Sequence, residues 1–387
     1  MYRLVQRRGI IGLFCLLFVA SSVVPGWAQK DNRFEVSKNL DIFNSLLKEV
    51  EMFYVDSVDV DKTVQRGIEA MLSGLDPYTE YYPEQNMEEL NLMTTGEYGG
   101  IGSLIRQRNN EGGVMIAEPT EGMPADLAGL KPGDLILAID SIDVSKATNS
   151  RVSELLKGVP NTKMVLTIRR PGEKKPRKFE ITRKQITTPQ VTYYGVKNDS
   201  IGYIYLKAFT IKSAQEVKEA FLDLKKNHNI KSLVLDLRGN GGGVLEGAVQ
   251  IVGMFVPKGS EVLSTKGKIK QWDRTYRTST EPLDTVMPLA ILINGGTASA
   301  AEIVSGSLQD MDRAVLVGQR SFGKGLVQAP RDLPYNGKVK ITMSKYYIPS
   351  GRCIQQIDYS HRKEDGSVAA IPDSLTSVFY TSKKRPV

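Results

Sequence analysis

Two short apolar segments, each followed by a glycine-rich turn, constrain the fold of this chain more than any other feature. Residues 233–237 and 289–293 have the length of single β-strands, and the first is of the apolar kind that a sheet buries on both faces. The first is followed by Arg-Gly-Asn-Gly-Gly-Gly and the second by Asn-Gly-Gly-Thr-Ala-Ser. With a further strand pattern at 201–206, they predict a strand–helix–strand arrangement from about residue 187 onward.

The helices of this region have their own signals. Ser213, with Glu216 three residues later, has the pattern of a capping box and predicts a helix start. Apolar residues at helical spacing continue from there to Leu224. A further helix is expected near residues 244–256.

The residues before 187 divide into two regions. Residues 29–95 are amphipathic and predict an N-terminal helical region, with helices at about 39–53 and 61–75. Residues 96–186 instead contain short apolar runs broken by glycine, which predict a separate domain. Its expected strands lie at 114–117, 135–139 and 164–168, and its expected helices at 124–130 and 149–156.

The first 28 residues have the order of a secretory signal peptide. Three arginines precede an apolar run at 10–20, and Gly26 and Ala28 supply small residues at a cleavage point. We therefore expect an exported protein, periplasmic or in the cell envelope. The alternative is an uncleaved leader that associates with a membrane, although the run is slightly short for a spanning helix.

The charge distribution bears on nucleic-acid binding, and the cysteine content bears on disulfide formation. The formal net charge is +8, but the cations are scattered. The one dense stretch, residues 169–178, has no interleaved aromatic residues, so no nucleic-acid partner is expected. Only Cys353 would remain after removal of the leader, so the mature chain can form no intramolecular disulfide.

Ser299 is the first candidate for chemistry. It follows a buried strand and two glycines, and it lies where a run of small residues opens a helix. Backbone N–H groups and the helix dipole at such a position can stabilise an oxyanion. The same pattern also fits a serine that only starts a tightly packed helix. The glycine turn at 238–243 is equally open to two interpretations, an anion-binding loop or a loose connection.

A serine nucleophile needs a base, and Lys324 is the best candidate. His228 and His361 both lie in polar, charged segments without the small residues that usually surround a site. Burial of Lys324 between two glycines would lower its pKa from about 10.4 toward 7, and the neutral amine could then take the Ser299 proton. The preceding residues resemble a nucleotide-binding P-loop, but Gly325 stands where that loop needs a hydroxyl.

These residues, taken in order along the chain, resemble the C-terminal processing peptidases, also called tail-specific proteases. The similarity runs from about residue 54 to residue 365. The segments that carry it are 75–79 (Leu-Asp-Pro-Tyr-Thr), 96–102, 130–134, 235–242, 297–303, 321–325 (Ser-Phe-Gly-Lys-Gly) and 347–352.

The resemblance implies a role for each site residue. Ser299 is the expected nucleophile, Lys324 the general base, and Gln328 the residue that supports the lysine. The oxyanion donors are expected among the backbone amides of Gly242, Gly243 and Ala300.

The resemblance also implies the architecture, an α+β multidomain fold. A PDZ domain is expected at 96–186 and a crotonase-like ββα protease core at 187–387. In the PDZ domain, a substrate C-terminus would add as a strand and its carboxylate would meet a loop of backbone amides. That loop is expected to consist of Tyr98, Gly99, Gly100, Ile101 and Gly102.

The expected partners are protein or peptide substrates with accessible C-termini. No cofactor or metal is expected. A homo-oligomer is one possible assembly. Family members usually continue further, so the end at Val387 raises the expectation of a truncated or naturally short chain. Two alternatives to a protease are a catalytically inactive PDZ scaffold that binds peptides and a crotonase-like enzyme that acts on thioesters.

Overall fold

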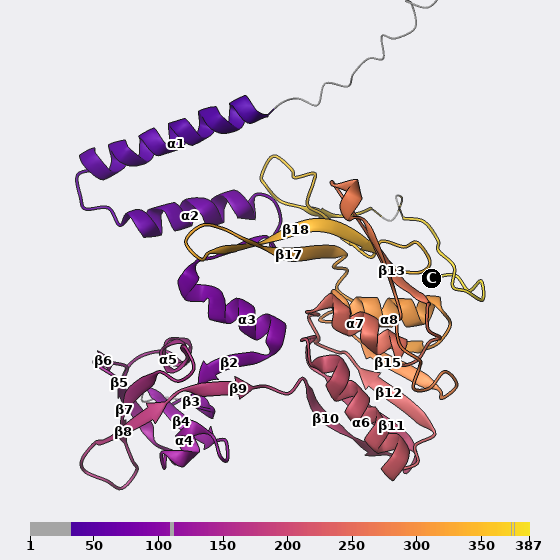
Figure 1. The fold of residues 1–387 in the computed structure, drawn as a ribbon, viewed down its shortest axis with the longest axis horizontal. Helices are drawn as coiled ribbons and strands as arrows, with labels where there is room; N and C mark the ends of the chain where they lie inside the picture. Colours follow the sequence, from indigo (N-terminus) through magenta and orange to yellow (C-terminus); the bar gives the residue numbers. More distant parts are fainter. Residues whose placement is uncertain (1–31, 109–111, 373, 375) are drawn as a thin grey trace, which may run out of the picture. The chain divides into compact units, whose positions relative to one another are not determined.

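The computed structural model describes residues 32–108, 112–372, 374 and 376–387 (Figure 1). The predicted leader, residues 1–28, lies outside the described residues. The chain forms two units, Met1–Ile68 and Glu69–Val387. Within the part that the structure describes, no helix combines the length and apolar character needed to cross a lipid bilayer.

The first unit contains helix α1 (Arg33–Phe53) and the start of helix α2 (Val60–Ser73), close to the predicted helices. None of the residues of α1 is buried. The second unit opens with the end of α2, followed by β1 (Glu80–Tyr82), η1 (Glu84–Asn86) and α3 (Met87–Thr95). Only helices were predicted before residue 96, and β1 is therefore a correction.

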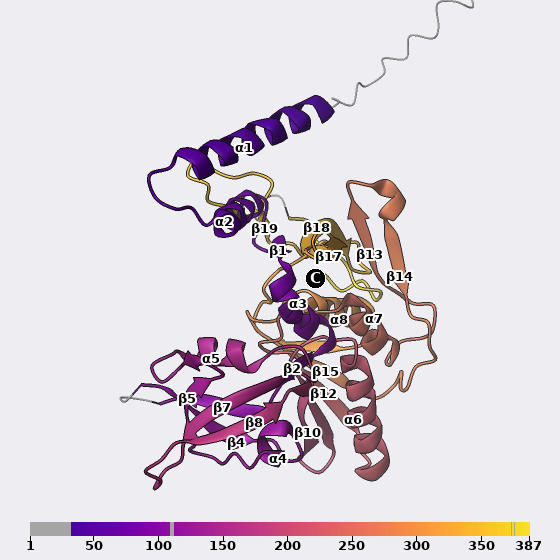
Figure 2. The same cartoon turned by 60° about the vertical axis from the view of Figure 1, so that its left-hand side comes forward.

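A compact β domain follows α3. Its first strand, β2 (Glu97–Gly100), pairs antiparallel with its last, β9 (Lys184–Thr187), so the chain enters and leaves at one place (Figure 2). The strands between form a sheet in the order β3-β4-β5-β7-β8, with β6 on β5. The bounds are β3 (Ser103–Gln107), β4 (Val114–Pro119), α4 (Pro124–Leu127), β5 (Leu135–Ile139), β6 (Ile142–Asp143), α5 (Asn149–Leu156), β7 (Lys163–Arg169) and β8 (Arg177–Thr182).

This domain has its own apolar core, in which Ile116, Ile136 and Leu166 are fully buried. One ion pair is also internal: Arg170 donates to both carboxylate oxygens of Asp134, at 2.8 and 2.7 Å. The side chain of Asp134 has no exposed surface, so the bidentate pair is needed to compensate its lost hydration.

The main sheet of the remaining chain has the order β10-β11-β12-β15-β16, with β10 antiparallel and the others parallel. Helices α6, α7 and α8 lie along it (Figure 1). The bounds are β10 (Val191–Lys197), β11 (Ile201–Leu206), α6 (Ser213–Asn227), β12 (Ser232–Asp236), α7 (Leu245–Gly253), β15 (Leu289–Ile293), α8 (Ala300–Asp310) and β16 (Val315–Gly318).

Two details differ from the prediction. Leu233 and Leu235 are buried with the helices. On the opposite face Val234 is only partly buried but Asp236 is 1% exposed, so that face of β12 is covered only in part. Ser213 is the first residue of α6 rather than its cap. The Glu216 carboxylate accepts hydrogen bonds from the N–H groups of Gln190 and Val191, because the strand entering the sheet offers unpaired donors there.

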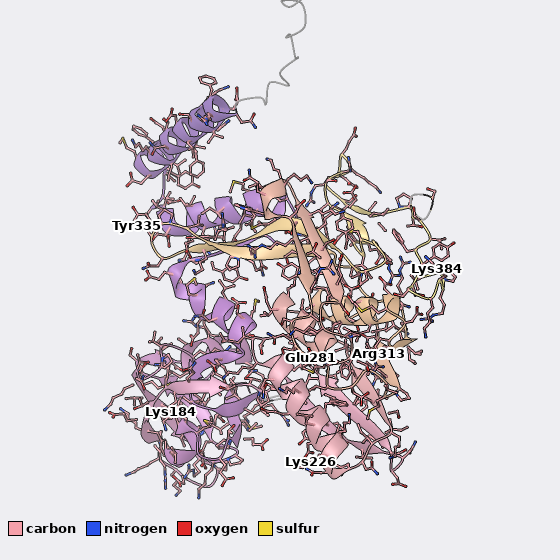
Figure 3. The ribbon with its side chains drawn as sticks, turned by 45° about the vertical axis from the view of Figure 1, so that its right-hand side comes forward. Lys184, Lys226, Glu281, Arg313, Tyr335 and Lys384 are labelled. Atoms are coloured by element: carbon pink, nitrogen blue, oxygen red, sulfur yellow. The ribbon has the colours of Figure 1, made fainter. Side chains whose placement is uncertain are left out.

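A second, antiparallel sheet is built around the long strand β18. It pairs with β17 along most of its length, and with β1 and β13 over separate stretches. Tyr335, 94% exposed, lies in the turn between β17 and β18 (Figure 3). The bounds are β13 (Glu261–Gly267), η2 (Lys270–Trp272), β14 (Arg274–Arg277), β17 (Leu326–Asp332), β18 (Lys338–Tyr347), β19 (Ile357–Asp358) and β20 (Ala369–Ala370).

Candidate active site

Ser299 lies between the end of β15 and the start of α8. Its backbone has φ 55° and ψ −119°, a conformation that a residue with a side chain rarely adopts. The preceding turn is fixed by Thr297, which is fully buried; its hydroxyl donates to the Leu237 carbonyl at 2.8 Å and accepts the Asn294 N–H at 2.9 Å. The turn therefore ties β15 to β12 and holds Ser299 in a strained position of the kind found at functional sites.

The glycine turn after β12 packs directly against Ser299. A Cβ atom on Gly242 would lie 2.7 Å from the Ser299 Cβ and 2.9 Å from the Ala300 nitrogen, so only glycine fits. Asn240, fully buried, holds this turn: its side chain donates to the Leu206 carbonyl and its own carbonyl accepts the Ala298 N–H, both at 2.9 Å.

The three predicted oxyanion donors differ in their availability. The Gly242 N–H donates to the Asn240 side-chain oxygen at 2.9 Å, so it is occupied in this structure. No hydrogen bond among the described residues engages the Gly243 N–H. Ala300 is the first residue of α8, where an N–H has no acceptor within the helix. Gly243 and Ala300 are thus the two predicted donors with an N–H that a substrate could use.

Lys324 lies between Gly323 and Gly325, just before β17, and it is partly buried. The Nζ atom is 4.1 Å from the centroid of the Tyr78 ring. Burial, and then the charge of Lys340, lower the pKa of Lys324 from its ordinary 10.5 to about 8. The carboxylates that act in the opposite direction are those of Asp76, Glu80 and Glu302.

A buried carboxylate links Ser299 to Lys324. Glu302 is 2% exposed, and its Oε2 accepts the backbone N–H groups of Ser299 at 2.8 Å and Lys324 at 2.9 Å. Its Oε1 accepts the Ser321 hydroxyl and the Gly323 N–H, both at 2.7 Å. Burial raises the pKa of Glu302, although these four hydrogen bonds oppose the shift.

Tyr346 makes a second link. Its hydroxyl lies 3.1 Å from the Ser299 carbonyl and 2.7 Å from the Lys324 carbonyl. The structure therefore brings the backbones of Ser299 and Lys324 together through two shared side chains. Among the described residues, no hydrogen bond joins the Ser299 hydroxyl to the Lys324 amine, which lies over Tyr78 instead.

The sequence interpretation missed both linking residues. Glu302 had a usable signal, since it follows Ser299 by the three residues of a capping box. Tyr346 had none, because it comes from a strand of the other sheet.

Gln328 lies on β17, but its amide donates to the Thr342 hydroxyl at 3.0 Å rather than contacting the Lys324 amine. The two histidines contact Asp223 and Asp358 rather than Ser299 or Lys324, and they are exposed, His228 to 51% and His361 to 86% of their side-chain surface. Among the described residues, no group of three or more His, Cys, Asp or Glu side chains could hold a metal ion.

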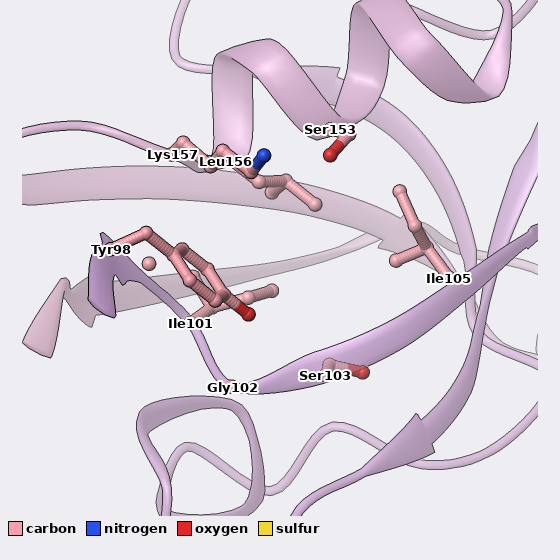
Figure 4. A pocket seen from close by; sticks show the side chains of 9 residues that line it. Tyr98, Ile101, Gly102, Ser103, Ile105, Ser153, Leu156 and Lys157 are labelled. Carbon is pink, nitrogen blue, oxygen red and sulfur yellow. The ribbon is translucent and has the colours of Figure 1, made fainter. Parts of the chain in front are cut away.

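The predicted carboxylate-binding loop borders a cavity of about 40 Å³ in the β domain (Figure 4). Tyr98, Gly100, Ile101 and Gly102 line it. Gly99 does not, and its N–H donates to the Glu88 carboxylate at 2.8 Å. The other lining residues are Ser103, Ile105, Ser153, Leu156 and Lys157, so an apolar floor lies beside one cation.

Comparison with known proteins identifies two parts of the chain. Residues 200–360 match Peptidase family S41, and residues 115–170 match the PDZ domain. The chain is 36% identical over 345 residues to a carboxy-terminal-processing protease of Bartonella bacilliformis, which covers 88% of this chain and 77% of that protein. It is 32% identical over 320 residues to a probable CtpA-like serine protease of Staphylococcus aureus, covering 82% of this chain and 62% of the relative. Among solved structures, a photosystem II D1 C-terminal processing protease is 27% identical, with a TM-score of 0.45 and coverage of 88% and 90%.

Proposed function

Because this chain belongs to the S41 family of serine peptidases, we propose that it cuts protein substrates near their C-termini with Ser299 as the nucleophile and Lys324 as the general base. The relative at 36% identity is itself named a carboxy-terminal-processing protease. The observation that carries the proposal is the Glu302 carboxylate, which accepts the N–H groups of both Ser299 and Lys324.

The lowered pKa of the Lys324 amine suits the role of general base. With a pKa of about 8, roughly a tenth of the amines are neutral at pH 7 and about half at pH 8. The neutral amine takes the Ser299 proton as the hydroxyl oxygen attacks the scissile carbonyl carbon. It then returns that proton to the departing amine, and water releases the acyl group in a second round.

The backbone supplies the remaining part of the chemistry. The N–H groups of Gly243 and Ala300 are the donors for the oxyanion that forms during attack. Among the described residues no hydrogen bond joins the Lys324 amine to the Ser299 hydroxyl, so the amine has to turn toward Ser299 for the proton transfer, and its flexible four-carbon stem allows such a rotation.

The PDZ domain holds the substrate. An extended C-terminus adds as a strand beside β3, with its terminal carboxylate at the amides of Gly100, Ile101 and Gly102. Lys157 borders the same cavity and adds a positive charge. A small apolar terminal side chain would fill the space between Ile101, Ile105 and Leu156.

Cleavage of an unfolded reporter with an apolar C-terminus tests this function. Ser299→Ala and Lys324→Ala should each lose cleavage while they still bind a fluorescent peptide with that C-terminus. Retained cleavage in either variant would contradict the assignment. Peptide binding by the parent chain without cleavage of any such reporter would favour the peptide-binding scaffold instead.

We also propose that the protein is exported. The basic residues and apolar run before Gly26 support this location. The mass of the protein from a cell-envelope fraction tests it: loss of about 28 residues is expected, and a full-length chain in the cytoplasm would contradict it.

A further inference from the structure

The ring of Tyr78 contacts the amine of Lys324, although the two residues are far apart in the chain. The Nζ atom lies 4.1 Å from the ring centroid. Among the described residues, no hydrogen bond or ion pair engages this amine, so the ring is the contact that defines where it lies. Tyr78 belongs to the Leu-Asp-Pro-Tyr-Thr segment, which has no role in the reaction scheme above.

The turn that carries Tyr78 is rigid. The buried Asp76 carboxylate accepts the N–H groups of Tyr78 and Thr79, both at 2.8 Å, and the Thr79 hydroxyl at 3.0 Å. Thr79 is 4% exposed, and its hydroxyl accepts the backbone N–H of Thr342 on β18 at 3.2 Å. The turn is thus fastened to the sheet whose strand β17 begins two residues after Lys324.

Gln328 belongs to the same connection. Its amide donates to the Thr342 hydroxyl, which lies 3.3 Å from the hydroxyl of Thr79. Gln328 therefore contacts the strand to which the turn of Tyr78 is fastened, and its expected support of the lysine stays a prediction.

A second tyrosine also contacts this ring. Tyr359, which follows β19, meets Tyr78 edge-on, with ring centroids 5.9 Å apart and planes at 90°. The two hydroxyls are 3.3 Å apart. Burial and this hydrogen bond raise the pKa of the Tyr78 hydroxyl well above its ordinary 10, so the phenol remains neutral at the pH values at which a peptidase is assayed.

We propose that Tyr78 is a positioning residue for the catalytic base: its ring shields the Lys324 amine from water and fixes the place where that amine rests, and Tyr359 holds the ring there. The inference rests on the proposed role of Lys324 as the base.

The ring has two opposing effects on the amine. Its exclusion of water disfavours the ammonium form, whereas its π face attracts an ammonium ion. Burial is the largest cause of the lowered pKa of Lys324, and the ring, which lies 4.1 Å from the amine, contributes to that burial; the proposal takes the exclusion of water to be the larger of its two effects. Removal of the ring should therefore raise the pKa toward its ordinary value.

Four charged groups also act on this amine, and substitution of Tyr78 leaves all of them in place. Lys340 of β18 favours the neutral amine, and three carboxylates favour the ammonium. They come from the turn, from β1 and from α8, and are Asp76, Glu80 and Glu302. A change of pH profile in a Tyr78 variant is then assigned to the ring.

The test is the pH dependence of kcat/KM from pH 6 to 10 for the parent, Tyr78→Phe and Tyr78→Ala. Parent and Tyr78→Phe, which keep a ring, should share a midpoint near pH 8. Tyr78→Ala should move the midpoint up by about one pH unit or more, so that activity falls roughly tenfold at pH 7 and recovers above pH 9.5. The exposed tyrosine of the β17–β18 turn gives the matched control, Tyr335→Ala, which should follow the parent.

An unchanged midpoint in Tyr78→Ala, or a loss by the same factor at every pH, would overturn the proposal, because a purely structural role predicts that result. If Tyr78→Ala does not fold, Tyr359→Ala decides: a smaller upward movement is expected, and an unmoved midpoint overturns the proposal. Lys324→Ala distinguishes a failure of the proposed function from a failure of the role proposed for Tyr78. If that variant cleaves like the parent, the proposed function fails; if it is inactive while Tyr78→Ala keeps the parental midpoint, only the role of Tyr78 fails.

Discussion

Replacement of Glu302 by glutamine should damage both stability and activity. The carboxylate accepts four hydrogen bonds, two on each oxygen, from three backbone N–H groups and one hydroxyl. Glutamine has a single carbonyl oxygen, so its amide leaves without an acceptor either the N–H groups of Ser299 and Lys324 or only that of Gly323. In the second orientation the Ser321 hydroxyl can turn and accept from the NH₂ group. Each buried donor without an acceptor costs about 1–3 kcal/mol.

The net loss of stability in Glu302→Gln is smaller than the summed cost of the donors left without an acceptor. Burial raises the pKa of Glu302, which means that the buried charge is itself unfavourable, and a neutral amide recovers part of that penalty. We expect Glu302→Gln to lower the free energy of unfolding by about 1–3 kcal/mol. Activity should fall by about a hundredfold or more, because the backbones of Ser299 and Lys324 lose their shared acceptor.

Denaturant unfolding measures the stability change. In a chain without the leader, Trp272 is the single tryptophan, and Arg331 of β17, the strand that follows Lys324, lies over its ring, so its fluorescence reports on this sheet. Ser321→Ala is the matched control: it removes one donor but leaves the acceptor bound by Gly323, and should cost about 1 kcal/mol. A Glu302→Gln variant with parental stability and parental kcat would refute this reasoning.

Two further predictions concern Lys324 and the glycine turn. Because the pKa of Lys324 in the folded protein is about 8, below its ordinary 10.5, the unfolded chain binds more protons between these values, and the parent gains stability as pH rises through that window. Lys324→Met carries no charge that must be buried, so at pH 7 it should be more stable than the parent by about 2 kcal/mol after allowance for partial exposure. This difference in stability should shrink toward pH 10. A difference that does not depend on pH would contradict the prediction. Gly242→Ala should lose cleavage, because its Cβ would lie 2.7 Å from the Cβ of Ser299. The control is Gly241→Ala, whose Cβ has open space and which should behave like the parent. Equal activity of the two variants in a peptide-cleavage assay would count against the close packing of this turn.

The parts of the fold that the sequence predicted well are those set by local patterns. Strands 201–206 and 289–293 agree with β11 and β15 residue for residue, because each is a short run rich in apolar or aromatic residues that a polar residue, Lys207 or Asn294, ends. The position of Ser299 just before α8 followed from the same pattern.

What the sequence did not predict depends on contacts between distant segments. Glu216 matched a capping box, but its carboxylate instead accepts hydrogen bonds from the N–H groups of Gln190 and Val191 at the start of β10. Gln328 has the expected spacing from Lys324, yet the hydroxyl of Thr342 on the neighbouring strand receives its amide. Tyr78 and Tyr346 reach the site from segments that no periodicity connects to it, so only the folded chain reveals them.

The rate at which a fluorophosphonate labels Ser299 tests the central claim most directly, because it reports proton removal from that hydroxyl without any need for a bound protein substrate. We predict that the rate in the parent rises with pH about a midpoint near 8, and that Lys324→Ala is labelled at least about a hundredfold more slowly, with no such midpoint. Labelling of Lys324→Ala at the parental rate, with the parental pH dependence, would contradict the account.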